Sequence, residues 1–268
     1  MEFHILTIFP RMLEGPFDDS IIRRARDKGI VTIRVHDIRD YARDRHRVVD
    51  DYPYGGGPGM VMKPEPIFEA VDDVRAQVRR GHEGRGVEDD ADDTPIILLS
   101  PRGRPFNHQV ARDLSLHPSL ILICGHYEGV DERVRQHLAT DEISLGDYVL
   151  TGGELAAMVV VDAVVRFLPG ALGSQESLEQ ESHAGGLLEH PQYTRPPEYR
   201  GWRVPEVLLS GHHQEIARWR RRQTLLHTLE QRPDLLEKAP LTEEERRLIE
   251  DSRRGEGSPS EQADSEGS

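Results

Sequence analysis

Two short runs of consecutive apolar residues stand out in the first half of the chain. They are Ile96–Leu99 and Leu120–Cys124. Strands that are buried on both faces of a parallel sheet have such continuous apolar sequences. Two further strands are predicted by Phe3–Phe9, which is rich in β-forming residues, and by Ile30–Val35, which alternates apolar and polar positions. The pattern therefore predicts a sheet that is largely shielded from water.

Stretches with helical periodicity separate these strands. Residues 20–27 favour a helix, and Pro66–Arg80 carries an apolar stripe at helical spacing. Leu155–Leu168 is an apolar helix that a glycine pair opens and a Pro-Gly pair closes. Because strands alternate with helices along this half of the chain, the sequence predicts one α/β domain over residues 1–170.

The composition changes after residue 170, where glycine, serine, glutamate and glutamine predominate as in a linker. Residues 195–198 and 202–209 look irregular. Helices are predicted over His213–Gln231 and over Thr242–Ser252, which begins with a capping-box pattern. The predicted boundaries are a linker over 171–185, a small, mostly helical domain over 186–252 and a disordered acidic tail over 253–268.

The formal net charge of −14 is concentrated in two segments. Residues 82–93 hold six acids and one base, and residues 255–268 hold four acids and no base. Both have the composition of disordered segments, so an acidic insert is predicted over about 82–94. Arginines cluster elsewhere, at 23–26, 39–47 and 218–222. One such cluster is usually a solvated helix face, but three in an acidic protein favour a surface for a polyanion.

Cys124 is the only cysteine, which excludes an internal disulfide and fits a reducing compartment. At the end of an apolar strand it is most simply a buried core residue. No window reaches the roughly 18 to 20 apolar residues that cross a bilayer, and no leader is apparent. We therefore expect a soluble, cytoplasmic protein without a membrane partner. The pair His212-His213 lacks further ligands at metal spacing, so it predicts a helix start and no metal site.

Two glycine-containing segments follow buried strands and point to a ligand. Residues 124–133 read CGHYEGVDER, and residues 143–154 read ISLGDYVLTGGE. Ligands of open α/β sheets collect beyond the carboxyl ends of strands, where glycine loops present bare backbone groups. There Glu128 can hold an ammonium group while glycine amides hold a carboxylate; the alternative is a solvated surface acid. Residues 55–59 lack the spacing of a phosphate-binding loop and by themselves predict a turn.

The order of these segments resembles that of bacterial TrmD-type tRNA (guanine-N1)-methyltransferases, which belong to the knotted SPOUT superfamily. The resemblance runs from residue 1 to about residue 250 and misses only the acidic insert and the tail. The matching segments are Tyr54–Met60, Leu99–Gly103, Cys124–Arg133, Gly146–Leu155, Arg166–Gly170, Gly186–Leu188, Tyr193–Pro196 and Val207–Gly211. Eight segments in register make this resemblance very specific.

The resemblance implies an N-terminal α/β SPOUT domain with a deep trefoil knot and a homodimer whose active site lies at the dimer interface. It also implies S-adenosylmethionine as the cofactor, and it leaves a role for Mg²⁺ open. The implied cofactor-binding residues are Leu99, Ser100, Pro101, Gly125, Tyr127, Glu128, Ser144, Leu145, Gly146, Tyr148, Leu150, Gly152 and Gly153.

The implied reaction methylates N1 of guanine 37 of tRNA, which lies 3′ of the anticodon and follows another guanine, and so maintains the reading frame. N1 of neutral guanine carries a proton, so a base has to remove it while a cation stabilises the charge on the neighbouring oxygen. By resemblance Arg166 is the cation. Glu181 matches the base, where the family has an aspartate, and Glu176 and Glu179 are its rivals. The predicted RNA-binding residues are Arg195, Arg218, Arg220 and Arg221.

Two other classes of protein stay open. A non-catalytic RNA-binding protein would explain the arginines but not the cofactor loops beside a carboxylate. A knotted methyltransferase that acts on ribose or ribosomal RNA would share the cofactor site, but we would not expect it to share Tyr193–Pro196 and Leu208–Gly211. Cofactor binding separates the first class from the enzyme, and mapping the methylated atom separates the second.

Overall fold

A computed structural model describes residues 1–83, 93–173 and 181–254. The chain divides into two compact units, Met1–Gly173 and Ser174–Ser268. Most of the predicted acidic insert, the middle of the predicted linker and nearly all of the predicted tail lie outside the described residues.

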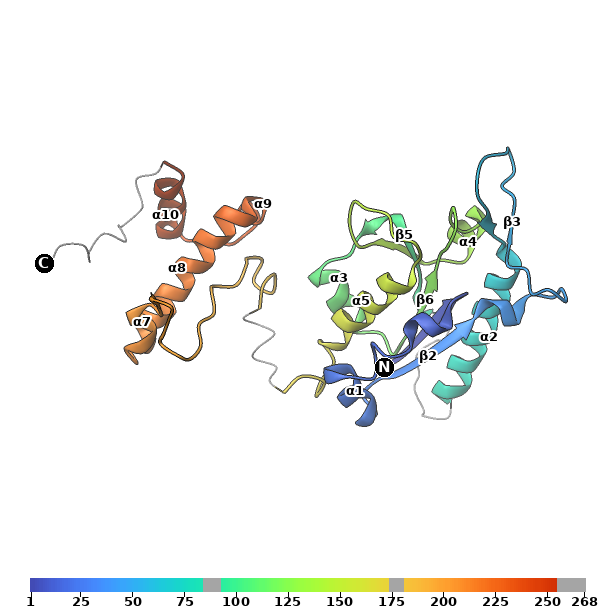
Figure 1. Cartoon of the computed structure of the whole chain (residues 1–268), viewed down its shortest axis with the longest axis horizontal. Coiled ribbons are helices and arrows are strands. Elements are labelled where there is room, and N and C mark those ends of the chain that lie inside the picture. The colour runs from blue at the N-terminus through green and yellow to red at the C-terminus, as the bar shows by residue number, and fades with distance from the viewer. Residues whose placement is uncertain (84–92, 174–180, 255–268) are drawn as a thin grey trace, which may run out of the picture. The chain divides into compact units, whose positions relative to one another are not determined.

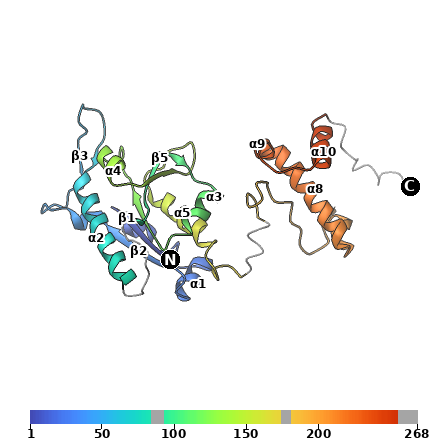
Figure 2. The same cartoon turned by 180° about the vertical axis from the view of Figure 1, so that it is seen from behind.

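The first unit is a parallel five-stranded sheet with helices on both faces (Figures 1 and 2). The strand order is β2-β1-β6-β5-β7, and every neighbouring pair is parallel. The strands are β1 Glu2–Thr7, β2 Thr32–Asp37, β5 Ile96–Pro105, β6 Ser119–Cys124 and β7 Asp141–Ser144. The helices are α1 Ser20–Asp27, α2 Pro64–Glu83, α3 His108–Leu114, α4 Glu132–His137 and α5 Glu154–Val165. Shorter elements are the 3₁₀ turns Pro10–Leu13 and Ile38–Tyr41 and the antiparallel pair β3 Asp50–Asp51 and β4 Val61–Met62.

Alternate residues of the central strands β1, β5 and β6 pack into two separate apolar cores. On β6, Leu120, Leu122 and Cys124 join the core formed with α1, α3 and α5, whereas Ile121 and Ile123 join the core formed with α2 and α4. All five side chains are fully buried. The prediction of a parallel sheet covered on both faces is confirmed, and so is the burial of Cys124. Burial raises the pKa of the Cys124 thiol well above its ordinary value, so the thiol is an inert core residue.

The second unit contains helices around a smaller apolar core. The described elements are β8 Glu198–Tyr199, β9 Trp202–Arg203, α7 Glu206–Leu209, α8 His213–Gln231, α9 Pro233–Leu236 and α10 Glu243–Arg254. The core residues are Leu187, Leu225, Leu236, Ala239 and Ile249. The capping box is confirmed, because the Thr242 hydroxyl accepts from the N–H of Glu245 and the Glu245 carboxylate accepts from the N–H of Thr242.

One prediction for the second unit was wrong. Residues 195–198 and 202–209 are not irregular throughout, since they contribute to the β8–β9 hairpin and contain the short helix α7. The hairpin turns at Arg200 and Gly201, which both have positive φ, as a two-residue hairpin turn requires. Strands of two residues and a helix of one turn are too short to give a periodic sequence, which explains the error.

Candidate active site

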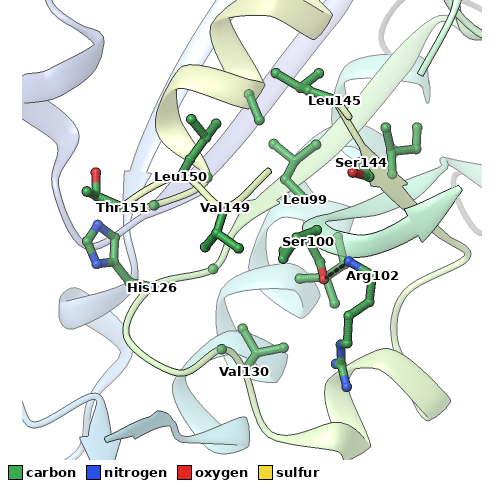
Figure 3. A pocket seen from close by; sticks show the side chains of 18 of the residues that line it. Leu99, Ser100, Arg102, His126, Val130, Ser144, Leu145, Val149, Leu150 and Thr151 are labelled. Carbon is green, nitrogen blue, oxygen red and sulfur yellow. Dashed lines mark hydrogen bonds between the residues drawn. The ribbon is translucent and has the colours of Figure 1, made fainter. Parts of the chain in front are cut away.

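The carboxyl ends of β5, β6 and β7 surround a cavity of about 320 Å³ (Figure 3). Ligands of parallel α/β sheets bind at this edge, and the volume lies in the range of small-molecule pockets. Twelve of the thirteen residues predicted to bind a cofactor line the cavity. They are Leu99, Ser100, Pro101, Gly125, Tyr127, Glu128, Ser144, Leu145, Tyr148, Leu150, Gly152 and Gly153.

Gly146, the thirteenth residue, shapes the wall without lining the cavity. The Ser144 hydroxyl accepts a hydrogen bond from the N–H of Gly146 at 3.2 Å and donates one to its C=O at 3.0 Å. A Cβ at position 146 would lie 2.8 Å from a ring carbon of Tyr148. Glycine therefore lets the Tyr148 ring fold back over the loop.

The start of α5 lies directly against the end of β6. The N–H of Gly153 donates to the C=O of Gly125 at 2.9 Å, and His126 forms a β-bridge with Gly152. A Cβ on Gly153 would lie 2.6 Å from the Cα of Cys124, a backbone atom that cannot move aside. Glycine at position 153 is thus required for the two segments to meet.

Glu128 joins the cavity to the glycine-rich loop at residues 55–59. Tyr127, just before it, has a φ of 59°, a conformation that non-glycine residues rarely adopt and that is found preferentially at functional sites. The N–H of Glu128 donates to the C=O of Met60 at 3.0 Å, and a Cβ on Gly59 would overlap the Glu128 carboxylate. The loop that alone predicted only a turn therefore packs against a residue of the cavity.

A buried carboxylate behind the cavity was missed by the sequence analysis. Glu154, in the first turn of α5, is fully buried and accepts a hydrogen bond from the Thr7 hydroxyl at 2.6 Å. Its other oxygen lies 3.6 Å from Nε2 of His126, which lines the cavity beside Thr151 (Figure 3). The helix N-terminus favours a negative charge at this position. The available signal was an acid in the first turn of a largely apolar helix. Arg102, Val149 and Thr151 were also missed among the lining residues.

The two predicted catalytic residues are not among the residues that line the cavity. Arg166 is the half-buried C-cap of α5, while the N-terminus of α5 lies at the cavity. The 12 residues of α5 separate these ends by about 18 Å. Glu181 belongs to the second unit, where its C=O accepts a hydrogen bond from the N–H of Ala184 at 3.2 Å.

The four predicted RNA-binding arginines are exposed residues of the second unit. Arg221 donates to Glu245 of α10 at 2.6 Å, and this hydrogen bond lowers the pKa of the Glu245 carboxyl. Within residues 181–254, Arg195, Arg218 and Arg220 take part in no ion pair. In the first unit, by contrast, Arg26, Arg43 and Arg47 pair with carboxylates.

Neither a membrane span nor a metal cluster is found in the part of the chain that the structure describes. No helix there is both long enough and apolar enough to cross a bilayer. The described residues also contain no group of three His, Cys, Asp or Glu side chains placed to hold a metal ion. His212 and His213 stand at the N-terminus of α8, as the sequence predicted.

A sheet covered on both faces, with glycine loops that enclose a cavity beyond three strand ends, defines an α/β domain built to bind a small ligand. Residues 1–238 match the family model described as tRNA (Guanine-1)-methyltransferase TrmD, and the chain belongs to this family. Three relatives bear the name tRNA (guanine-N(1)-)-methyltransferase. The protein from Dehalococcoides mccartyi strain BAV1 is 57% identical over 94% of this chain and 96% of its own length. Those from Geotalea uraniireducens and Staphylococcus epidermidis are 55% and 53% identical, over 96% and 93% of this chain and 99% and 96% of their own lengths.

Proposed function

We propose that this protein transfers a methyl group from S-adenosylmethionine to N1 of guanine 37 of tRNA, where the preceding nucleotide is also guanine. The observation that carries the proposal is the cavity lined by residues that lie in or follow β5, β6 and β7, in a chain whose family match covers residues 1–238. The modification maintains the reading frame, and we place it in the cytoplasm because its substrate is tRNA. Family membership favours this reaction over a non-catalytic RNA-binding role and over methylation of ribose or ribosomal RNA.

The cavity fits a cofactor that is apolar and flat at one end and charged at the other. Leu99, Leu145 and Leu150 supply an apolar lining for a purine ring. Gly125, Gly152 and Gly153 line the cavity with backbone that no side chain covers, and Glu128 supplies a carboxylate for an ammonium group. When bound, S-adenosylmethionine supplies the methyl group as an electrophile. A requirement for Mg²⁺ has no support from the described residues.

The strand order supports a knotted backbone. β7 lies beside β5, on the side away from β6, yet the chain after β7 returns to the end of β6 through the hydrogen bond from Gly153 to Gly125. On this path it passes the end of β5. Ile143 pairs with both Leu99 and Arg104, so β7 contacts two stretches of β5 that a shift in strand register separates. Knots are essentially absent from most folds, and this crossing is the kind of path that one requires.

A homodimer would bring Arg166 to a cavity. Because Arg166 lies at the far end of α5, about 18 Å from the start of the helix at the cavity, we propose that the Arg166 that serves this cavity comes from a second copy. Leu155 and Val159, one turn apart on α5, are 47% and 46% exposed and form an apolar stripe that starts beside the cavity. We propose that these stripes pack together in the dimer.

The chemical roles follow from the reaction. Glu181 would remove the proton from N1 of guanine, and Arg166 would stabilise the negative charge that develops on the neighbouring oxygen. Arg195, Arg218 and Arg220 would bind tRNA phosphates, with a smaller contribution from Arg221 because it is already held by Glu245.

The test is transfer of a labelled methyl group to paired tRNA transcripts that differ only at position 37. We expect methylation of the transcript with guanine and none of the transcript with adenine, and mapping should place the methyl group on N1. Methylation of a ribose, or equal labelling of both transcripts, would contradict the proposal.

A further inference from the structure

The second unit contains a groove to which the proposed function assigns no occupant. It encloses about 570 Å³ between α7, α8 and the extended residues 190–197. Ile216, Trp219 and Arg220 of α8 line it, and their spacing of three and four residues places them on one face of the helix. The volume lies in the range of pockets that hold small ligands.

Two aromatic rings line this groove. The ring centroids of Tyr193 and Trp219 are 6.3 Å apart with their planes tilted by 58°, and Tyr193 is 50% exposed. Neither residue belongs to the apolar core of the second unit. The rings are thus available to a ligand without being needed to hold the helices together.

The polar side chains of the groove suit an anion. Arg195 and Arg220 line it, and none of its lining residues is acidic. Neither arginine takes part in an ion pair within residues 181–254. Aromatic rings beside guanidinium groups bind single-stranded nucleic acids, because the rings stack on bases while the guanidinium groups attract phosphates.

We propose that this groove holds one unpaired nucleotide of the tRNA, with its base against Trp219 and Tyr193 and its phosphate near Arg195 and Arg220. The inference rests on the proposed function, since it takes tRNA as the substrate. It adds a recognition site for a loop nucleotide within the second unit. A base-paired nucleotide cannot bind in this groove, because both faces of its base are stacked on neighbouring bases inside the RNA helix.

Tryptophan fluorescence tests the proposal in the full-length protein. The chain has two tryptophans, so Trp202→Phe leaves Trp219 as the only indole and keeps an aromatic ring opposite Tyr199. An RNA stem-loop with unpaired loop bases should quench the Trp219 emission. A fully paired duplex of equal length should leave it unchanged. Equal quenching by both RNAs, or none by the stem-loop at saturation, would overturn the proposal.

Binding measurements at several salt concentrations separate stacking from charge. Trp219→Leu should weaken tRNA binding between about fivefold and a hundredfold and leave the salt dependence unchanged, since it removes no charge. Arg220→Gln should reduce the slope of log K against log salt by about one. Trp219→Phe should retain most of the affinity, and a urea unfolding curve checks that each variant is folded. A folded Trp219→Leu variant with wild-type affinity would show the inference to be wrong.

Methyl transfer by the wild type to the same tRNA tests the proposed function separately from the proposed nucleotide-binding groove. A wild type that fails to methylate tRNA contradicts the proposed function. An active wild type whose Trp219 does not respond to the stem-loop contradicts only the groove assignment. If Trp219 emission instead changes with protein concentration in the absence of RNA, the groove is a contact between copies and the inference fails.

Discussion

His4 is a buried residue of β1 that should make stability depend on pH. Its ring stacks on that of His36, with Nδ1 3.0 Å from Nε2 of His36. Burial and the neighbouring His36 lower the pKa of His4 from 6.5 to about 4, and burial also lowers the pKa of His36. The surrounding charged groups are Glu2, Arg34 and Asp73, of which Glu2 acts on His4 in the opposite direction. A lowered pKa means that the unfolded chain binds the proton first.

The neutral histidines should therefore make their full contribution to the free energy of unfolding above pH 6.5. This contribution should decrease as the pH falls towards 4. His4 alone accounts for about 3 kcal/mol of this loss. The measurement is urea unfolding at pH 7.5 and at pH 5, which avoids most carboxylate titration. His4→Gln should flatten the difference between the two conditions. An unchanged difference in that variant would assign the pH dependence to other groups.

Glu181 stands where the family has an aspartate, and a prediction about catalysis depends on this difference. Glu181→Gln should keep the fold and tRNA binding but lower turnover by a factor of roughly 100 to 10,000, the range for lost acid–base catalysis. Glu181→Asp should retain substantial activity because it keeps the carboxylate. Single-turnover methyl transfer measures both variants. If Glu181→Gln turns over normally while Glu176→Gln or Glu179→Gln is inactive, the base is one of those residues.

At the scale of elements, α5 begins beside the cavity and ends at Arg166. This separation allows a test in which two inactive variants complement each other. In the proposed dimer, the Arg166→Ala and Glu128→Ala variants should each be nearly inactive. Mixed subunits should regain activity, because one site of the heterodimer then combines an intact cavity with an intact Arg166. Activity after mixing and dialysis from mild denaturant measures this. No recovery in a heterodimer that demonstrably forms would mean that Arg166 acts on the cavity of its own chain.

The same scale shows what the sequence could predict. The bounds of α1 and α8 were predicted correctly, because both helices have clear start and stop signals. Most cavity residues could also be placed, since they directly follow buried strands. The contact between Thr7 and Glu154 could not be predicted, because 147 positions separate the two residues and no periodic pattern joins them. The extension of β5 to Pro105 was missed because its last residues are stabilised by pairing with β7 and not by their own apolar character.

At the scale of the whole molecule, the acidic segments should be dispensable for catalysis. Residues 82–93 and 255–268 contain too few apolar side chains to bury a core. Deleting either segment should leave the melting temperature and the turnover close to those of the wild type. Affinity for tRNA should rise slightly at low salt, since each deletion removes negative charge. Loss of turnover in either deletion variant would show that the segment contacts the substrate or regulates the enzyme.

The loops around the cavity also determine how a small molecule can enter and leave. Three of the walls are backbone segments fixed by β5, β6 and the start of α5, so none of them can swing away without breaking strand pairing. Among the exposed side chains that line the cavity, Tyr148 and Val149 are 57% and 79% exposed and can rotate into solvent. Exchange of spent for fresh cofactor then requires rotation of these side chains at the entrance of the cavity. The exchange rate should depend more strongly on the size of these two side chains than on the stability of the domain.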